Sequence, residues 1–327
     1  MGDSLTSVSN TLDFAFCVND GYVPYICVTI KSILSHRKKN RIQIHILTDS
    51  ISPQNRKRLD RLFCNLQDAF YQIISVDKRL LSGLTTRSWS IFAWFRIFLP
   101  QYLPSDIKRV LYLDADTLVT DDLSELCALK MDEAAIAGVP DPLTFEPETF
   151  IRCGYRFDQQ YVCSGVLLMN LDYWRQHDLT SSVLAYAKKH TDSLRFPDQD
   201  AINAVCHDCK IILPLRFGVQ ASFFTSACFY KKPYVHEILL CLEHPAIIHF
   251  AGNAPWIKEW ATHYYQKEWE YYNRMLTPPA KQFYLTKGWP FVKMLFWNMM
   301  HPDARRKKVI SYEEIMNRIS AVQKNDS

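Results

Sequence analysis

The stretch that decides the fold is Lys108-Arg109-Val110-Leu111-Tyr112-Leu113-Asp114-Ala115-Asp116, a short apolar run that ends in two carboxylates. Runs of this length, rich in Val, Leu and Tyr, are typical of a buried strand in a parallel sheet. Because side chains alternate along a strand, Asp114 and Asp116 project the same way from its carboxyl end, where open α/β sheets bind ligands. The stretch therefore predicts either a site for a hard divalent cation such as Mg²⁺ or Mn²⁺, or a turn with two solvated aspartates.

The composition is that of a globular protein with a large core. The 327 residues are 48% hydrophobic and 22% charged, which suits one large α/β domain with an appendage or two small domains. The net charge of +4 is too small to require a nucleic-acid partner. With nine glycines and no G-x-G-x-x-G or G-K-[ST] pattern, a glycine-rich phosphate loop is not expected.

The ten cysteines are scattered, most of them within apolar runs, which is typical of buried free thiols in a reducing compartment. Cys206-His207-Asp208-Cys209 has a C-x-x-C spacing but no second pair, so a structural zinc site, which needs four ligands, is not expected there. The first residues are polar and acidic, and no segment approaches the roughly 20 apolar residues of a membrane span. We therefore expect a cytoplasmic protein.

The order of the predicted elements indicates a doubly wound sheet. Strands over 12–18, 41–47 and 69–76 alternate with helices over 25–35 and 52–66. This β-α-β-α-β order is typical of a Rossmann-like, mostly parallel sheet in the α/β class. An aromatic helix is predicted after the third strand, and further apolar runs predict strands; these segments are 88–99 for the helix and 134–139, 161–171, 211–214 and 245–252 for the strands.

Several polar residues at the ends of these segments have both a functional and a structural interpretation. The residues 19–22, Asn-Asp-Gly-Tyr, follow the first strand and suit a nucleotide base or ribose, or form an ordinary turn. Arg96, alone among aromatic side chains, needs a phosphate or a structural carboxylate as its partner. Asp198 and Gln199 either serve a site or cap a helix, and His249 is either a ligand or a satisfied core histidine.

The C-terminal region differs from what precedes it. Residues 281–308 carry seven Lys or Arg and one acidic residue, interleaved with Trp289, Phe291 and Trp297. A basic, aromatic and amphipathic segment suits an anionic membrane surface, and a C-terminal helix docked on the main domain gives the same pattern. We predict a main domain over 12–260 and a helical C-terminal region over 261–327.

Six motifs together resemble glycosyltransferase family 8, in particular the bacterial lipopolysaccharide glucosyl- and galactosyltransferases. The motifs are N-D-G-Y at 19–22, R-I-F-L from Arg96, V-L-Y-L-D-A-D at 110–116, C-S-G-V-L-L-M-N-L at 163–171, P-D-Q-D-A-I-N at 197–203 and H-F-A-G at 249–252. No single motif is specific, but their order along the chain is that of the family. The resemblance implies a GT-A-type fold and a retaining transfer of glucose or galactose from a UDP-sugar. The acceptor would be a lipopolysaccharide core or another surface glycan, and the ion Mn²⁺, with Mg²⁺ as the alternative.

The resemblance also assigns roles to individual residues. Asp114, Asp116 and His249 would bind the metal, which fits because two hard carboxylates and a borderline imidazole favour Mn²⁺. The residues that would contact the UDP-sugar are Asn19, Asp20, Tyr22, Arg96, Ala115, Ser164, Gly165, Gly252 and Lys258. The residues that would face the donor sugar and the reacting carbon are Asp141, Asp198 and Gln199. Because a neutral amide is a poor nucleophile, a front-side displacement is expected, in which the leaving phosphate takes the acceptor's proton.

Two positions depart from the family pattern. Cys163 stands where the family has Asn, and 249–256 is one residue shorter than H-x-x-G-x-x-K-P-W and lacks its Lys, for which Lys258 would substitute. One alternative is a non-catalytic UDP-sugar-binding module, which the missing Lys favours. The other is a sugar nucleotidyltransferase, which needs a Gly-rich basic loop after the first strand. Acceptor recognition is expected in 142–160 and 220–235, and neither carries a decodable motif.

Overall fold

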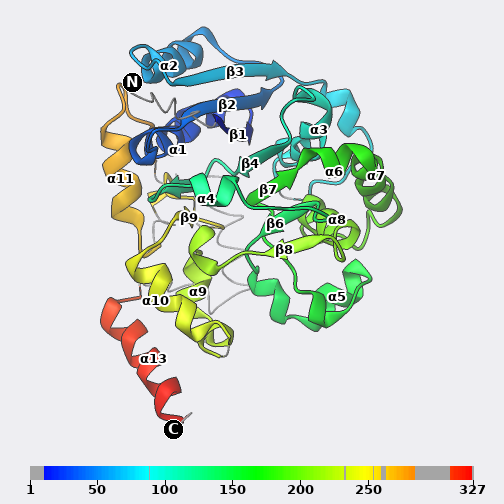
Figure 1. Ribbon diagram of the computed structural model, residues 1–327, viewed down its shortest axis with the longest axis vertical. Coiled ribbons are helices and arrows are strands. Elements are labelled where there is room, and N and C mark those ends of the chain that lie inside the picture. The colour runs from blue at the N-terminus through cyan, green and yellow to red at the C-terminus, as the bar shows by residue number, and fades with distance from the viewer. Residues whose placement is uncertain are drawn as a thin grey trace, which may run out of the picture.

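A computed structural model describes residues 11–87, 89–231, 233–252, 254–258, 263–283 and 310–325. Figure 1 shows a twisted sheet with helices on both of its faces. This sheet has seven strands in the order β3-β2-β1-β4-β7-β6-β8. Their bounds are β1 (Thr11–Cys17), β2 (Arg41–Thr48), β3 (Ala69–Ser75), β4 (Arg109–Leu113), β6 (Ile136–Gly138), β7 (Val166–Asn170) and β8 (Lys210–Ile212). A second sheet pairs β5 (Thr117–Val119) with β9 (Ile247–His249).

The strand directions confirm the predicted doubly wound, mostly parallel sheet. Strands β3, β2, β1 and β4 run parallel to one another, and β6 pairs with β8 in parallel. Strand β7 lies between β4 and β6 and is antiparallel to both. Among these seven described strands, β7 is therefore the reversed one, so its N-terminal end meets the carboxyl end of β4. At this meeting point the strand direction in the sheet reverses.

Helices cover both faces because alternate strand residues enter two separate cores. Phe14 and Phe16 of β1 pack on the side of α1, whereas Ala15 and Cys17 pack on the side of the aromatic segment after β3. The helices are α1 (Val23–His36), α2 (Pro53–Phe63), α3 (Leu99–Tyr102), α4 (Ser124–Cys127), α5 (Pro147–Cys153), α6 (Leu171–Gln176), α7 (Leu179–Lys189), α8 (Pro197–Val205), α9 (Ala221–Thr225), α10 (Val235–Glu243), α11 (Gln266–Arg274) and α13 (Tyr312–Asn325). The 3₁₀ helices include η3 (Ile91–Phe98) and η4 (Pro142–Phe145).

Three segments differ from the prediction in their boundaries or type. The helix expected over 88–99 is the 3₁₀ helix η3 followed by the short α3, whose first turn carries Pro100. The strand expected over 161–171 pairs as β7 only from Val166, because residues 161–165 turn toward the site described below. The loop expected over 142–160 contains η4 and α5, and α5 ends at Gly154 in the left-handed conformation.

The described part of the C-terminal region packs against the main sheet's helices. Helix α11 lies beside α1 (Figure 1), and its Trp269 is fully buried in the same core. Helix α13 buries Ile315 and Ile319, and its Arg318 lies 5.6 Å from the ring centre of Tyr230. The basic and aromatic residues 284–309 lie outside the described residues. Among the described helices, none is both long enough and apolar enough to cross a membrane.

Helix α8 is anchored by a carboxylate that is fully buried. Asp200 Oδ2 accepts hydrogen bonds from the backbone N–H groups of Arg195 (2.7 Å) and Phe196 (3.1 Å), which lie at the start of the helix. The same carboxylate pairs with Arg152 Nε of α5 at 3.0 Å and accepts from the Tyr161 hydroxyl at 2.6 Å. Asp200 thus fixes the two residues that lead into α8, a task that the sequence did not assign to it, and it also ties α8 to α5.

We expect Asp200→Asn to lower the free energy of unfolding by about 3 kcal/mol, because it leaves the Arg152 guanidinium without its buried charge partner. The matched control is Glu146→Gln. That substitution removes the exposed pair with Arg195 (3.1 Å) and is expected to cost less than about 1 kcal/mol. Urea unfolding of both variants measures the difference. Equal losses in the two would contradict an anchoring role for Asp200.

Candidate active site

The two strand-end aspartates and the histidine come together as the sequence predicted. Asp114 follows β4, Asp116 precedes β5, and His249 is the last residue of β9. Strand pairing creates the cluster, because Thr117 lies opposite His249 in the β5–β9 ladder and Phe250 N donates to Asp116 O at 2.9 Å. His249 Nε2 lies 3.4 Å from Asp116 Oδ1 and 4.0 Å from Asp114 Oδ2. Among the described residues, these three form the one group of three or more acidic, His or Cys side chains that could hold a metal ion.

The donor set of this cluster fits a divalent cation. Its ligand atoms lie within 4.8 Å of one another, so one ion can reach all three. Burial would lower the pKa of His249, but its neighbours Cys163 and Asp116 outweigh burial and raise that pKa well above its ordinary value. A proton and a metal ion therefore compete for the same imidazole nitrogen of His249. Metal affinity of such a cluster falls as the pH falls.

The backbone segment Cys163-Ser164-Gly165, just before β7, contacts five of the predicted site residues. Gly165 O accepts from Asp114 N at 2.8 Å, and Cys163 Sγ lies 3.5 Å from His249 Nδ1. Ser164 N donates to Gln199 Oε1 at 2.8 Å, and its Oγ donates to Asp198 Oδ2 at 3.3 Å. Ser164 O accepts from Arg96 Nη1. This one segment thus holds side chains from the end of β4 and from β9, α8 and η3 in fixed positions relative to one another.

Gly165 is required by the space that the cluster occupies. A Cβ atom at this position would lie 2.2 Å from His249 Cε1 and 2.7 Å from Asp114 Oδ2. Neither neighbour can move without leaving the cluster, so any other residue at 165 displaces a candidate metal ligand. The sequence predicted that Gly165 contacts the UDP-sugar, and the structure shows in addition that it leaves room for His249 and Asp114.

Arg96 is buried, with 2% of its surface exposed, and carboxylates surround it. Its Nη2 lies 3.1 Å from Asp114 Oδ1 and 3.4 Å from Asp198 Oδ2, and its guanidinium lies 4.3 Å from the ring centre of Tyr112. The Tyr112 hydroxyl donates to Asp114 Oδ1 at 2.5 Å. Asp114 and Asp198 are the structural carboxylates that the sequence offered as partners of Arg96, and a contact with a ligand phosphate stays a prediction. The guanidinium therefore fixes Asp114 and Asp198.

Asp141 and Gln199 lie on the other side of the same site. Asp141 Oδ1 accepts from Leu143 N at 3.0 Å and so caps η4. Burial raises the pKa of Asp141 to about 6, although His249, Gln199 and Gln220 all act to lower it. Sequence reasoning missed Gln220, which no motif marks. Gln220 lies near the site because its neighbour Val219 is hydrogen-bonded to the strand of His249: His249 N donates to Val219 O at 3.0 Å.

The residues predicted to hold the base divide into two groups. Asp20 is occupied elsewhere, since its Oδ1 accepts from Ser52 N and Asn55 Nδ2, both at 2.8 Å, at the start of α2. Tyr22 is 39% exposed and lies edge-on to Trp256 with ring centres 5.8 Å apart. Burial raises the pKa of Tyr22, and the charges of Asp116 and Asp114 raise it further, which places its ring beside the cluster.

The aromatic surface beside the cluster includes a residue that the sequence did not single out. Tyr25 stacks on Trp256 with ring centres 4.0 Å apart and an angle of 18° between the planes. Tyr22, Tyr25 and Trp256 form the group that we call the aromatic wall. Flat rings of this kind offer a stacking surface for a flat ligand such as a base.

The remaining predicted contacts lie around this wall or within the cluster. The carbonyl of Asn19 accepts from Tyr22 N at 3.0 Å, which closes the turn that presents Tyr22. Ala115 is buried between the two aspartates. Gly252 adopts a left-handed conformation, with φ of 71°, just after β9. Lys258 N donates to Phe283 O at 3.0 Å, which fixes the start of its side chain.

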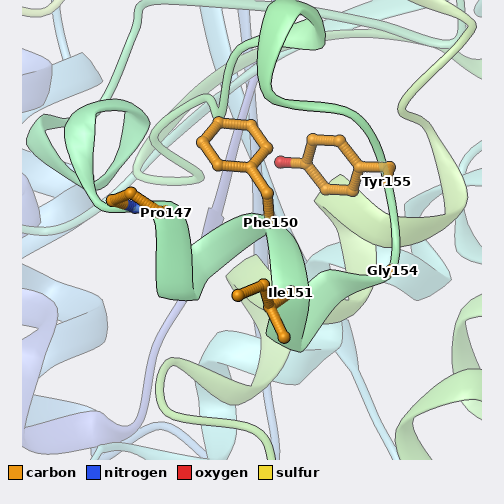
Figure 2. A pocket seen from close by; sticks show the side chains of 5 residues that line it. All are labelled: Pro147, Phe150, Ile151, Gly154 and Tyr155. Atoms are coloured by element: carbon orange, nitrogen blue, oxygen red, sulfur yellow. The ribbon is translucent and has the colours of Figure 1, made fainter.

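An apolar hollow lies apart from these residues, on α5. It has a volume of about 580 Å³ and is lined by Pro147, Phe150, Ile151, Gly154 and Tyr155. Figure 2 shows the rings of Phe150 and Tyr155 next to each other, and their centres are 5.2 Å apart. The hollow belongs to the segment 142–160 and shares no residue with the Asp114–Asp116–His249 cluster.

Comparisons with known proteins agree with this geometry. The family model for glycosyl transferase family 8 matches residues 13–261. The general stress protein A of Bacillus subtilis (strain 168) is 27% identical over 267 residues, which cover 78% of this chain and 91% of that protein. The lipopolysaccharide 1,2-glucosyltransferase of Escherichia coli (strain K12) is 28% identical over 260 residues, covering 78% of this chain and 75% of that protein.

Solved structures show the same architecture. The galactosyltransferase LgtC, crystallised with donor and acceptor sugar analogues, matches with a TM-score of 0.72 at 24% identity. The match covers 81% of this chain and 96% of LgtC, and it confirms the predicted fold class, the GT-A fold. The family model spans well over half of the sequence, from the first strand to just beyond the last. The chain therefore belongs to glycosyl transferase family 8.

Proposed function

We propose that this protein is a retaining glycosyltransferase that moves a glucose or galactose from a UDP-sugar to a saccharide acceptor, a lipopolysaccharide core or another surface glycan. The observation that carries the proposal is the Asp114–Asp116–His249 cluster at the carboxyl end of β4, with a flat aromatic wall beside it. The names of the relatives support the acceptor class, since two are lipopolysaccharide 1,2-glucosyltransferases from Escherichia coli.

Asp114, Asp116 and His249 would hold the metal ion. Two carboxylate oxygens and one imidazole nitrogen suit Mn²⁺, and Mg²⁺ is the alternative ion. When bound, the ion would supply positive charge to the diphosphate of the departing UDP. Arg96 pairs with Asp114 and Asp198, and Asp116 lies beside His249, so three carboxylates meet one guanidinium and one imidazole among the described residues. This excess of negative charge favours a divalent cation.

The nucleotide would lie between the cluster and the aromatic wall. The charges of Asp116 and Asp114 act on the hydroxyl of Tyr22, and the turn that begins at Asn19 presents this side chain. In this arrangement Asp20 acts on the protein rather than on the ligand, by fixing the start of α2. Arg96 likewise acts on Asp114 and Asp198, and Lys258 stays the candidate for the diphosphate contact that the family places on its missing Lys.

Gln199 and Asp198 would face the reacting carbon. Ser164 N holds the amide oxygen of Gln199, and Arg96 and Ser164 hold the carboxylate of Asp198. A carboxylate tied by two partners and a neutral amide are both poor nucleophiles, which supports a front-side displacement. Their oxygens would stabilise positive charge on the sugar, and the leaving phosphate would take the proton from the acceptor hydroxyl. A covalent sugar adduct trapped on either side chain would rule this route out.

A non-catalytic UDP-sugar-binding module is the second candidate, and the missing Lys of the H-F-A-G segment favours it. Against it stands the cost of keeping several buried charges in place without a use for them. We also infer that the C-terminal region attaches the enzyme to an anionic membrane surface on the cytoplasmic side. The support is the composition of residues 281–308 alone, seven basic residues against one acidic.

We expect release of UDP from one UDP-hexose in a panel, in the presence of Mn²⁺ and not of EDTA. Asp116→Asn is expected to reduce that release by more than about 100-fold, because it removes one charged ligand from the cluster. The matched control is Asp121→Asn, whose carboxylate pairs with Arg216 on the surface and is expected to leave the rate unchanged. Binding of UDP without any release, even with a panel of saccharide acceptors, would favour the binding module.

Gly165→Ala is expected to abolish Mn²⁺-dependent UDP release while the chain still folds. The added methyl group would lie against His249 and Asp114, so the cluster must open even though the sheet stays intact. Steady-state UDP release, read beside the circular dichroism spectrum, separates loss of the site from loss of the fold. A Gly165→Ala protein with the wild-type rate and the wild-type metal requirement would show that the packing around Gly165 does not matter.

Asp141→Asn is expected to stabilise the free protein at pH 8 and to lose that advantage below about pH 4. The pKa of Asp141 is about 6 in the folded chain, above its ordinary value of 3.8, so the folded state holds the proton longer than the unfolded state does. Stability of the wild type therefore falls as the pH rises between these two values. Denaturant unfolding at pH 4, 6 and 8 measures the effect. An advantage of the variant that is the same at all three pH values would contradict it.

A further inference from the structure

Two cysteine side chains meet at the C-terminal end of α8, away from the candidate active site. Cys206 is the residue that ends the helix, and Cys209 N donates to Cys206 O at 3.2 Å, which closes a four-residue turn. The two cysteines lie at the two ends of this turn, and each affects the pKa of the other thiol. The ends of such a turn lie within about 7 Å, and a disulfide spans Cα separations of about 4.4–6.8 Å. The pair can therefore be joined with little movement of the backbone.

The two thiols differ in access to solvent. Cys206 is fully buried in the core that contains Ala201 and Ile202 of α8, whereas Cys209 is half-buried. A reagent from solvent therefore meets Cys209 first, and Cys206 stands directly behind it. This is the arrangement of an attacking thiol and a resolving thiol.

A buried amine next to the pair favours a negative charge on sulfur. The Lys210 Nζ atom is buried and has no hydrogen-bond partner among the described residues, and it lies 4.8 Å from the ring centre of Tyr155. Burial lowers the pKa of Lys210 to about 8, and Cys206 and Cys209 are the neighbours that most oppose this lowering. A thiolate would give the ammonium a closer counter-charge than Asp208, the carboxylate that acts on it more weakly than either cysteine.

The surroundings of Cys209 point the same way. A hydrogen bond from the Cys206 thiol is the main factor that lowers the pKa of Cys209 to about 7, and a hydrogen bond from Tyr173 and the charge of His207 also contribute. The ring of His207 stacks on Tyr155 at 5.6 Å, so Tyr155 covers both His207 and Lys210. Metal binding is not the use of this turn, since its side chains do not form a group of three ligands in the described part of the chain.

We propose that Cys209 and Cys206 form a dithiol that exchanges reversibly with low-molecular-weight disulfides, independently of the sugar-transfer site. The Cys209 thiolate attacks one sulfur of RS–SR, which forms Cys209–S–SR and releases one RS⁻. The Cys206 sulfur gives up its proton to solvent and attacks Cys209 in turn, which forms the Cys206–Cys209 disulfide and releases the second RS⁻. The dithiol loses two electrons, and RS–SR gains them as two thiols. The disulfide closes the turn between α8 and β8.

The test is incubation of the full chain with glutathione disulfide at pH 7, followed by mass spectrometry of the intact protein and its peptides. The wild type is expected to become two hydrogens lighter, with 206 and 209 joined. Cys206→Ser is expected to stop at one glutathione on Cys209, and Cys209→Ser to leave Cys206 unmodified. Glutathione found on the exposed Cys64 while Cys206 and Cys209 stay free would overturn the proposal.

The role of the buried amine has its own control. Lys210→Met keeps the length of the side chain and removes its charge, and it is expected to slow modification of Cys209 several-fold. Lys188→Met, on the exposed side of α7, is expected to leave the rate unchanged. If the two variants react at the same rate, the thiolate does not depend on Lys210, and this part of the proposal is wrong. Reduction with dithiothreitol must restore the free thiols, because irreversible loss would contradict an exchange site.

Discussion

The site depends on one close approach, that of the Cys163-Ser164-Gly165 backbone to the end of β4. Gly165 O accepts from Asp114 N at 2.8 Å, and the missing side chain at 165 leaves room for the ring of His249. The reversal of β7 makes this approach possible, because it directs the start of β7 toward the carboxyl end of β4. Once the segment is in place, its peptide groups and side chains align residues from four separate elements. A change that moves this backbone therefore moves the cluster and the catalytic candidates together.

Charge explains why the same place suits a cation. Asp114, Asp116 and Asp198 converge there, and Arg96 neutralises one charge while being fully enclosed by its partners. Burying several carboxylates without enough counter-charge raises the free energy of the folded protein, and a divalent ion with a diphosphate relieves it. The same excess of negative charge raises the pKa of His249, because a protonated imidazole supplies positive charge to the site in the absence of a metal ion. Buried carboxylates without enough counter-charge are expected where a cationic ligand binds.

The sequence could predict the sheet and the meeting of Asp114, Asp116 and His249 because both follow from local patterns. Because side chains alternate along the strand before Asp114, the side-chain directions of Asp114 and Asp116 can be predicted. The D-A-D and H-F-A-G motifs identify the three candidate ligands through the family resemblance. The sequence could not predict that Asp20 would accept hydrogen bonds from Ser52 and Asn55 at the start of α2, because these residues are distant in the sequence and meet Asp20 only in the fold. It also could not predict which carboxylates Arg96 would meet, and the fold brings Asp114 and Asp198 to it. Gln220 and Tyr25 carry no motif, and only the pairing of Val219 with His249 and the stacking on Trp256 bring them to the site.

The central claim is that three side chains from β4, β5 and β9 act together as one ion site. Titration of the full chain with Mn²⁺ in the presence of UDP, with free Mn²⁺ followed by electron paramagnetic resonance, tests it most directly. We predict one ion bound per chain, lost in His249→Ala and retained in His207→Ala, whose ring lies on Tyr155 beside the thiol pair. Binding of one ion that survives His249→Ala with unchanged affinity would contradict the assembly of the site from these strands.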